Sequence, residues 1–194
     1  MGVDHDERLL NLLGALSVAL ADRIAAATED AVGESATAVA ALVSAAQFPG
    51  TSIEELRHSL GLSHSAAVRV VDRLAARGLV ERRPGPRGPA VALFATAAGE
   101  RLATRVLDIR RDVVREVAGD GLSGALEPAL STMLARLTVD PEAGDRACRL
   151  CDVGACPKDR CPVSERQRAL GAVVPDAVVL PTLVTLQGHP LAGR

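Results

Sequence analysis

The stretch LGLSHSAAVRVVDRLAARGLVERR, residues 60–83, decides the fold. A helix before it is expected to end at Leu60, and a tight Gly61-Leu62 turn leads to Ser63, which can cap a second helix running to about Arg77. The second helix has an inward apolar stripe at helical spacing, made of Ala67, Val70, Val71 and Leu74. Two helices joined by a short turn with glycine predict a helix-turn-helix.

The segments upstream of this stretch also predict helices. Ser52 and Glu55 fit a capping box at the start of the helix that ends at Leu60. Another helix is expected from Ser35 to Gln47, ended by the turn Phe48-Pro49-Gly50. The first helix has apolar residues on more than one side, as expected for a helix shared with a partner subunit. Its main stripe is Leu9, Leu13, Leu16, Leu20 and Ile24.

Downstream, the sequence predicts a β-hairpin and two more helices. Gly78 is expected to close the second helix, and residues 79–83 and 90–94 read as two short strands around the proline-rich turn 84–89. Thr96 can cap a long helix, and a further helix carries Leu126, Leu130, Leu134 and Leu137, with Pro128 in its first turn or at a kink. The expected fold is therefore mainly α with a small two-stranded β wing, a winged helix-turn-helix.

Composition fits a soluble globular protein with a locally basic surface. The chain has 194 residues, of which 48% are apolar, and its formal net charge is −2. Between Arg69 and Arg87, however, there are six arginines and only two acidic residues, Asp72 and Glu81. A small overall charge can conceal such a local excess, so a nucleic-acid partner is not excluded.

The quoted stretch, followed by Thr96-x-x-Gly99, resembles the core of the MarR family, and the resemblance covers about residues 5–140. It implies a homodimer joined through the first and last long helices, with each recognition helix in a major groove of double-stranded DNA and each wing along the backbone or minor groove. The implied function is a transcription regulator that acts on a palindromic operator, with a repressor as the expected role and an activator as the alternative. Its effector would be a small molecule in the cleft between the dimer and DNA-binding regions, or a signal at the cysteines described below.

The resemblance also assigns the residues that would contact DNA. They lie at the start of the recognition helix, on its exposed face and in the wing: Ser63, His64, Ser65, Arg69, Arg73, Arg83 and Arg87. Arginine offers a bidentate fork to guanine or phosphate, and a helix N-terminus with hydroxyl groups suits a phosphate oxygen.

All the cysteines of the chain lie in one short segment. Cys148, Cys151, Cys156 and Cys161 form the pattern C-x2-C-x4-C-x4-C, which can place four thiolates around one tetrahedral zinc ion. The pattern resembles a zinc knuckle with Cys156 in the place of histidine. These four cysteines are the predicted metal ligands, and zinc is the predicted metal.

Two alternatives for the cysteines stay open. The Cys156-Pro157 and Cys161-Pro162 pairs resemble iron–sulfur ligand segments, which makes an iron–sulfur cluster the alternative cofactor. Reactive thiols are the third possibility, because neighbouring cations would lower thiol pKa values. The cations near the cysteines in sequence are Arg146, Arg149, Lys158 and Arg160.

An enzyme is not expected, and a thiol- or metal-dependent oxidoreductase is the alternative function. The histidines are scattered, and four thiolates on one metal leave no open coordination position. The expected domains are a winged-helix domain with its dimerisation helices (5–140), a cysteine-rich extension (141–170) and a tail (171–194). Polar residues such as Asn11, Asp22 and Arg23 interrupt the apolar N-terminal segment, which argues against a signal peptide or membrane span and predicts a cytoplasmic protein.

Overall fold

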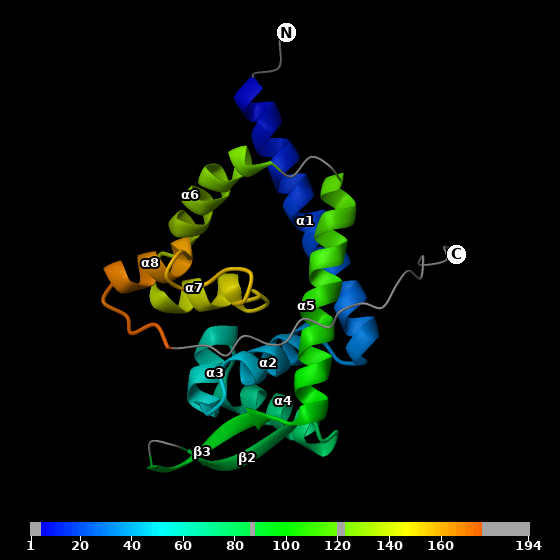
Figure 1. Cartoon of the computed structure of the whole chain (residues 1–194), viewed down its shortest axis with the longest axis vertical. Coiled ribbons are helices and arrows are strands. Elements are labelled where there is room, and N and C mark those ends of the chain that lie inside the picture. Colours follow the sequence, from blue (N-terminus) through cyan, green and yellow to red (C-terminus); the bar gives the residue numbers. More distant parts are fainter. Residues whose placement is uncertain (1–4, 86–87, 120–122, 176–194) are drawn as a thin grey trace.

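The computed structural model describes residues 5–85, 88–119 and 123–175 (Figure 1). Its elements follow in the order α1 (His5–Val32), α2 (Ala36–Gln47), β1 (Thr51–Ser52), α3 (Ile53–Leu60), α4 (His64–Ala76), β2 (Val80–Gly85), β3 (Gly88–Ala95), α5 (Ala97–Ala118), η2 (Gly124–Leu126), α6 (Glu127–Leu137), α7 (Pro141–Cys148) and α8 (Pro162–Ala169). The predicted class, mainly helical with a β wing, is confirmed.

The sheet has three strands instead of the two that were predicted. Its order is β1-β3-β2, all antiparallel, and the short β1 pairs Thr51 with Leu93 and Ser52 with Ala92. The hairpin strands also extend further toward the turn than expected, since Pro84 pairs with Val91. Proline is tolerated there because β2 is an edge strand, where a missing N–H interrupts no second ladder.

The helix caps are those that the sequence predicts. The Ser52 hydroxyl accepts a hydrogen bond from the Glu55 backbone N–H, and the Glu55 carboxylate accepts one from the Ser52 N–H. The Ser63 side chain accepts from the N–H of Ala66 in the same way. Gly61 ends α3 in the left-handed conformation, with φ at +66°, which glycine adopts without strain. These local signals fix the turn between α3 and α4.

The hydrophobic core lies around α2, which is buried along almost its whole length between α4, α5 and the sheet. Small residues in α2 allow its neighbours to approach closely, and four leucines fill the space between the elements: Leu42, Leu56, Leu74 and Leu93. The predicted inward stripe of α4 is confirmed, with Ala67, Val71 and Leu74 buried and Val70 packed against the core.

Thr96 and Gly99, the pair quoted in the motif, form the joint between the hairpin and α5. The Thr96 hydroxyl donates to the Gly78 carbonyl at 2.7 Å and accepts from the Gly99 N–H at 3.1 Å. A Cβ atom on residue 99 would lie 2.0 Å from the Leu79 carbonyl oxygen and 3.3 Å from a methyl carbon of Leu42. Only glycine therefore fits at this position.

We expect Gly99→Ala to destabilise the fold. The backbone at Leu79 cannot move without disturbing the start of β2, so the cost should reach at least the roughly 1–3 kcal/mol typical of overpacking. Urea denaturation would measure the loss. Gly124→Ala is a matched control, because a Cβ at residue 124 meets nothing within 4 Å, and equal stabilities of the two variants would refute the steric argument.

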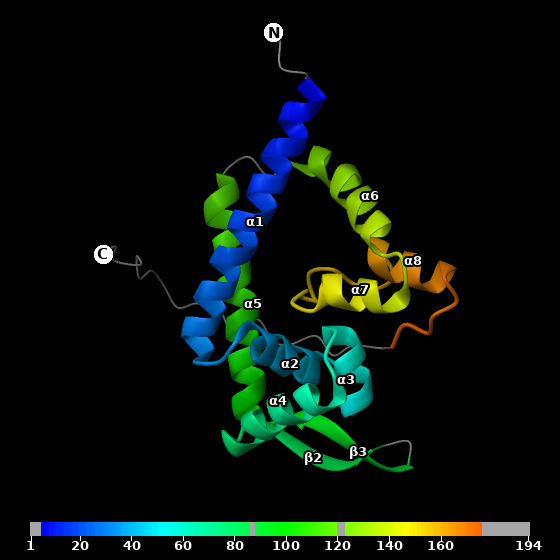
Figure 2. The same cartoon turned by 180° about the vertical axis from the view of Figure 1, so that it is seen from behind.

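In the upper part of the molecule, α1 and the end of α5 extend away from the winged-helix core, and α6 leads from there back to α8 (Figure 2). In the described chain, α1 is the one helix long and apolar enough to cross a membrane by length and composition. Many large apolar side chains on α1 and around α6 are exposed in the single chain: Leu9, Leu10, Leu12, Leu13, Leu16, Val18, Leu126, Leu130, Met133, Leu134, Leu137 and Val139.

The cysteine-rich extension folds into two short helices that sequence analysis did not predict. Each begins with a proline in its first turn: α7 follows Asp140, whose carboxylate accepts from the Ala143 N–H, and α8 follows Cys161. Proline at this position is pre-organised for a helix, so Asp140-Pro141 and Cys161-Pro162 were usable signals. Both views place the extension beside α3, on the side away from the wing (Figures 1 and 2).

Candidate nucleic-acid interface and thiol site

The first turns of α4 present the predicted contact residues to solvent. Ser63, His64, Ser65 and Arg69 are all exposed. The Nδ1 atom of His64 lies 3.8 Å from a carboxylate oxygen of Glu54 on α3. Among the described residues, Arg69 has no ion-pair partner. Its guanidinium group is therefore available to an anion outside the protomer.

Arg73, one turn further along α4, is engaged within the chain. Its Nη1 atom lies 3.3 Å from the Glu34 carboxylate, which also binds Arg77 at 3.2 Å. The Glu34 side chain is only 7% exposed, whereas the Arg73 side chain is 59% exposed. Arg73 can thus hold the α1–α2 connection against α4 while its outer face remains open to solvent.

Of the wing arginines, the structure describes Arg82 and Arg83, and both pair with acidic residues of the same chain. Arg83 pairs with Glu81, and its guanidinium carbon lies 5.3 Å above the centre of the Phe94 ring. Arg82 bonds to Asp72 at 2.6 Å, which joins the base of the wing to α4. Arg87 lies outside the described residues. The described part of the wing is basic and is tied to the recognition helix.

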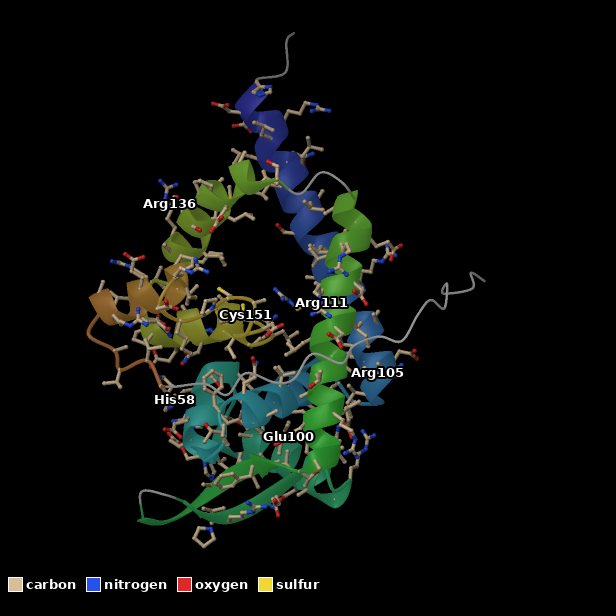
Figure 3. All side chains as sticks on the ribbon, in the orientation of Figure 1. His58, Glu100, Arg105, Arg111, Arg136 and Cys151 are labelled. Carbon is tan, nitrogen blue, oxygen red and sulfur yellow. The ribbon has the colours of Figure 1, made fainter. Side chains whose placement is uncertain are left out.

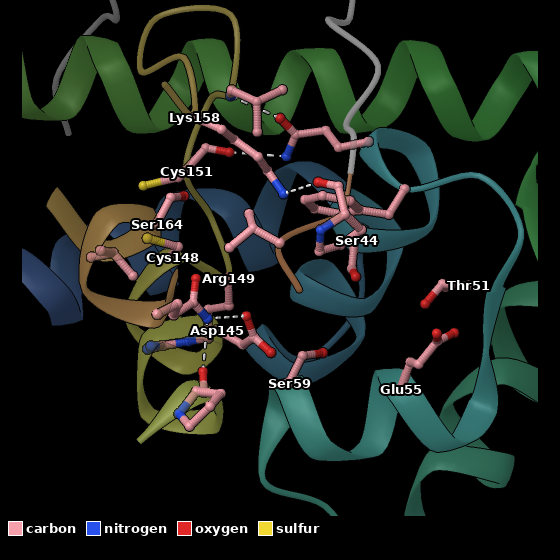
Figure 4. Close-up of a pocket in the computed structure, with 18 of the residues that line it drawn as sticks. Ser44, Thr51, Glu55, Ser59, Asp145, Cys148, Arg149, Cys151, Lys158 and Ser164 are labelled. Carbon is pink, nitrogen blue, oxygen red and sulfur yellow. Dashed lines mark hydrogen bonds between the residues drawn. The ribbon is translucent and has the colours of Figure 1, made fainter. Parts of the chain in front are cut away.

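The four cysteines converge on one cavity of about 560 Å³ between the α2–α3 region and the extension (Figure 4). Cys148 ends α7, Cys161 precedes α8, and Cys151 and Cys156 lie on the loop that joins these helices. Cys161 is buried, and the other three are half-buried. The spacing in the sequence therefore does bring the thiols into one neighbourhood.

The thiols are arranged as two hydrogen-bonded pairs. The bond from Cys148 to Cys151 raises the pKa of Cys148 and lowers the pKa of Cys151 to about 6. In the second pair, burial is the main cause that raises the pKa of Cys156 to about 11. Burial also opposes ionisation of Cys161, but hydrogen bonds from Ser164 outweigh it, and the pKa of Cys161 is lowered. In each pair, therefore, one thiol is easier to ionise than the other.

A cation from α5, far away in the sequence, also acts on these thiols. The charge of Arg110 contributes to the lowered pKa of Cys151 and partly offsets the raised pKa of Cys156. The four cations near the cysteines in sequence, from Arg146 to Arg160, were expected to play this part, but none of them contributes to the lowered pKa of Cys151. Sequence reasoning missed Arg110 because only the tertiary fold brings α5 to the loop.

The donor chemistry of this site fits a soft metal ion. All four candidate donors are sulfur atoms, and the pKa of Cys148 responds to the charges of the other three cysteines, so the four groups are close neighbours. Across the described ranges, however, no three His, Cys, Asp or Glu side chains are grouped tightly enough to hold an ion. The thiols would have to turn from their paired partners toward a common centre.

A buried glutamine at the end of α2 holds the cysteine loop. The Gln47 amide nitrogen donates to the Cys151 carbonyl at 2.9 Å, and its oxygen accepts from the Val153 N–H at 3.0 Å. Gln47 is only 2% exposed. Next to it, the Lys158 ammonium group lies 4.4 Å from the centre of the Phe48 ring. The loop that carries the thiols is therefore fastened to the winged-helix core.

These features define a winged helix-turn-helix protein with an added thiol-bearing extension. A sequence model described as the MarR family matches residues 35–88, which include the helix-turn-helix, β2 and the first residue of β3. A search of curated proteins found no match.

Several solved structures are similar to the chain. A MarR-family transcriptional regulator from Rhodococcus sp. RHA1 aligns with a TM-score of 0.56 and 20% identity, over 71% of this chain and 99% of its own. RV1404 from Mycobacterium tuberculosis aligns with a TM-score of 0.55 and 21% identity, over 71% and 94%. The MarR family protein RV2887 from the same organism, in complex with p-aminosalicylic acid, aligns with a TM-score of 0.50 and 24% identity, over 66% and 97%. At these identities the likeness establishes the fold.

Proposed function

We propose that the chain is a MarR-family transcription regulator, a repressor that binds a palindromic operator in double-stranded DNA as a cytoplasmic homodimer. The observation that carries the proposal is the exposed start of α4, where Arg69 has no ion-pair partner among the described residues, inside a helix-turn-helix followed by a basic wing. This arrangement is the one in which a recognition helix enters a major groove. We assign no enzymatic reaction to this helix-turn-helix and wing.

The exposed apolar side chains of α1 and α6 support the homodimer. Leu13 is 39% exposed, Leu16 48% and Leu130 50%, which leaves a large apolar surface uncovered in one chain. Surfaces of this kind mark interfaces, and a twofold-symmetric dimer would cover the same surface on both copies. The two recognition helices would then face two half-sites about one turn of DNA apart.

Selection from a random-sequence duplex pool tests the proposal directly. The full chain should enrich a site with twofold symmetry, and the logarithm of its affinity should fall with the logarithm of salt concentration by about 0.9 per phosphate neutralised. Enrichment of no sequence, together with binding that is equal for all duplexes, would contradict a sequence-specific regulator.

Arg69→Ala is expected to weaken binding to the selected duplex by roughly 10- to 100-fold, the equivalent of one lost base contact of about 1–3 kcal/mol. Fluorescence anisotropy at fixed salt would measure it. Arg105→Ala is the matched control, because Arg105 is an exposed arginine on α5 (Figure 3). If both variants lose affinity equally, Arg69 acts only through overall charge.

For the cysteines, we propose a structural zinc site, with an iron–sulfur cluster as the alternative cofactor. The four sulfur donors and the lowered pKa values of Cys151 and Cys161 support a soft metal. Elemental analysis and a visible spectrum of protein purified without oxygen should give one zinc per chain and no chromophore. Iron with sulfide and a visible absorption band would assign the cluster instead.

The paired thiols favour one other reading, a thiol-dependent oxidoreductase. Cys148 and Cys151 have the C-x2-C spacing and a thiolate with a pKa of about 6, features of reactive dithiols. Steady turnover of a disulfide substrate with a dithiol reductant would support this function.

We propose that the regulator also responds to a small-molecule effector, as the similar protein RV2887 was solved with p-aminosalicylic acid. Aromatic carboxylates are therefore the first compounds to test for release of the selected duplex.

A further inference from the structure

The loop that follows Cys148 and bears Cys151 and Cys156 contacts the winged-helix core as well as forming the thiol site. Leu150, between the first two cysteines, packs against the main hydrophobic core, the same core that holds α2, α3 and α4. The Arg146 side chain lies against Gly61, in the turn between the two helices of the helix-turn-helix: a Cβ on Gly61 would be 3.3 Å from it. The loop and α7 therefore contact the same core and the same turn that position α4.

Gln47 makes this contact specific, because both polar atoms of its buried amide are satisfied by the loop backbone. If the loop moved away, the amide would be left buried without partners, and that loss is costly inside a protein. The end of α2 would have to shift to let the amide reach water. The position of the loop and the position of α2 are thus locked together.

We infer that ligand binding at the four thiols and DNA binding by α4 are energetically coupled within one protomer, through Gln47 and Leu150. This inference rests on the proposed function, because it needs both a thiol ligand and a DNA site. A metal ion that gathers the four thiolates fixes the loop backbone at Cys151 and Val153, and this backbone holds Gln47. The coupling path thus runs through the end of α2 and the core on which α3 and α4 pack, in addition to any effect through the dimerisation helices.

Coupling between two sites is reciprocal, so it can be measured from either side. The probes are Zn²⁺, titrated in competition with a chromophoric chelator, and the duplex selected by the full chain. The Zn²⁺ affinity of the wild-type chain should change by about 10- to 100-fold when the duplex is saturating, and the duplex affinity should change by the same factor when Zn²⁺ is saturating.

Gln47→Met, which keeps the length of the side chain but removes both hydrogen bonds, should bring this coupling factor close to one while both ligands still bind. Thr28→Val is a control for the loss of a buried polar group, because the Thr28 hydroxyl donates within α1. It should leave the coupling factor at the wild-type value. Leu150→Ala is a second variant for the same path, in case Gln47→Met fails to fold.

The possible outcomes separate this inference from the proposed function. Wild-type protein that binds both Zn²⁺ and duplex, each with the same affinity in the presence and absence of the other, would overturn the coupling and leave the regulator intact. A coupling factor that survives in both Gln47→Met and Leu150→Ala would overturn the assigned path. Wild-type protein that binds no duplex would overturn the proposed regulator, and protein that binds no Zn²⁺ would overturn the proposed zinc site; the coupling falls in either case.

Discussion

Replacing Cys148 and Cys161 together by serine is expected to weaken Zn²⁺ binding by roughly a thousandfold or more. A four-thiolate site supplies about 10–16 kcal/mol of apparent binding free energy, and removing two of four ligands should remove several kcal/mol of it. The two residues belong to different hydrogen-bonded pairs and to different ends of the loop, so neither pair survives. Chelator competition on the wild type and the double variant measures the difference.

The same substitution should lower the stability of the extension, because α7 and α8 share a small core. Their packing depends on Gln167, whose amide donates to the Pro141 carbonyl and the Asp145 carboxylate at 2.8 Å each. Hydrogen exchange should show faster exchange in α7 and α8 than in α2. Wild-type protein stripped of metal is the control: it should match the double variant, and a much less stable variant would show that the thiols stabilise the extension without metal.

The winged-helix part was predictable from the sequence because its signals are local. Ser52, Ser63 and Thr96 cap helices through bonds to residues three positions away, and the apolar stripe of α4 has the period of a helix. The strand β1 was not predicted, because sequence analysis interpreted its two residues only as the start of the helix that Ser52 caps. Its partner, Leu93, is far away in the sequence.

The thiol site was predictable in its members but not in its surroundings. The spacing of the cysteines was enough to expect them together, as is found. Gln47 and Arg110 are far from the cysteines in the sequence, and nothing in the residues next to them suggests a contact with a cysteine loop. Only the tertiary fold, which joins the loop to α2 and brings it within electrostatic reach of Arg110 on α5, turns a glutamine and an arginine into parts of that site.

The ion pair of Arg73 could not be predicted from the helical pattern of the sequence. A helical face predicts which side chains point outward, but it does not say which of them find partners in the same chain. Glu34 lies between α1 and α2 and binds both Arg73 and Arg77. The role of Arg73 in DNA binding stays a prediction, and Arg69 is the better position for the first substitution.

Leu13→Glu combined with Leu16→Glu should produce a monomer that no longer binds the selected duplex tightly. The two side chains are three residues apart on one face of α1, 39% and 48% exposed, and charges there would have to be buried in the dimer. Two linked half-site contacts are worth about 10²- to 10⁴-fold in affinity over one, so the variant should lose a comparable factor. Sedimentation and anisotropy would measure both effects.

Leu170→Glu is the control for this experiment, because Leu170 is 37% exposed but follows α8 in the extension. It should leave the dimer and the affinity unchanged.

The experiment also decides whether α1 binds a second copy of the chain or a membrane, since α1 is long and apolar enough to span one by length and composition. A wild-type chain that is a dimer in buffer without detergent, and becomes a monomer only with the α1 substitutions, assigns this face to a second copy. A wild-type chain that stays in solution only with detergent, or a double variant that remains a dimer, would contradict the assignment.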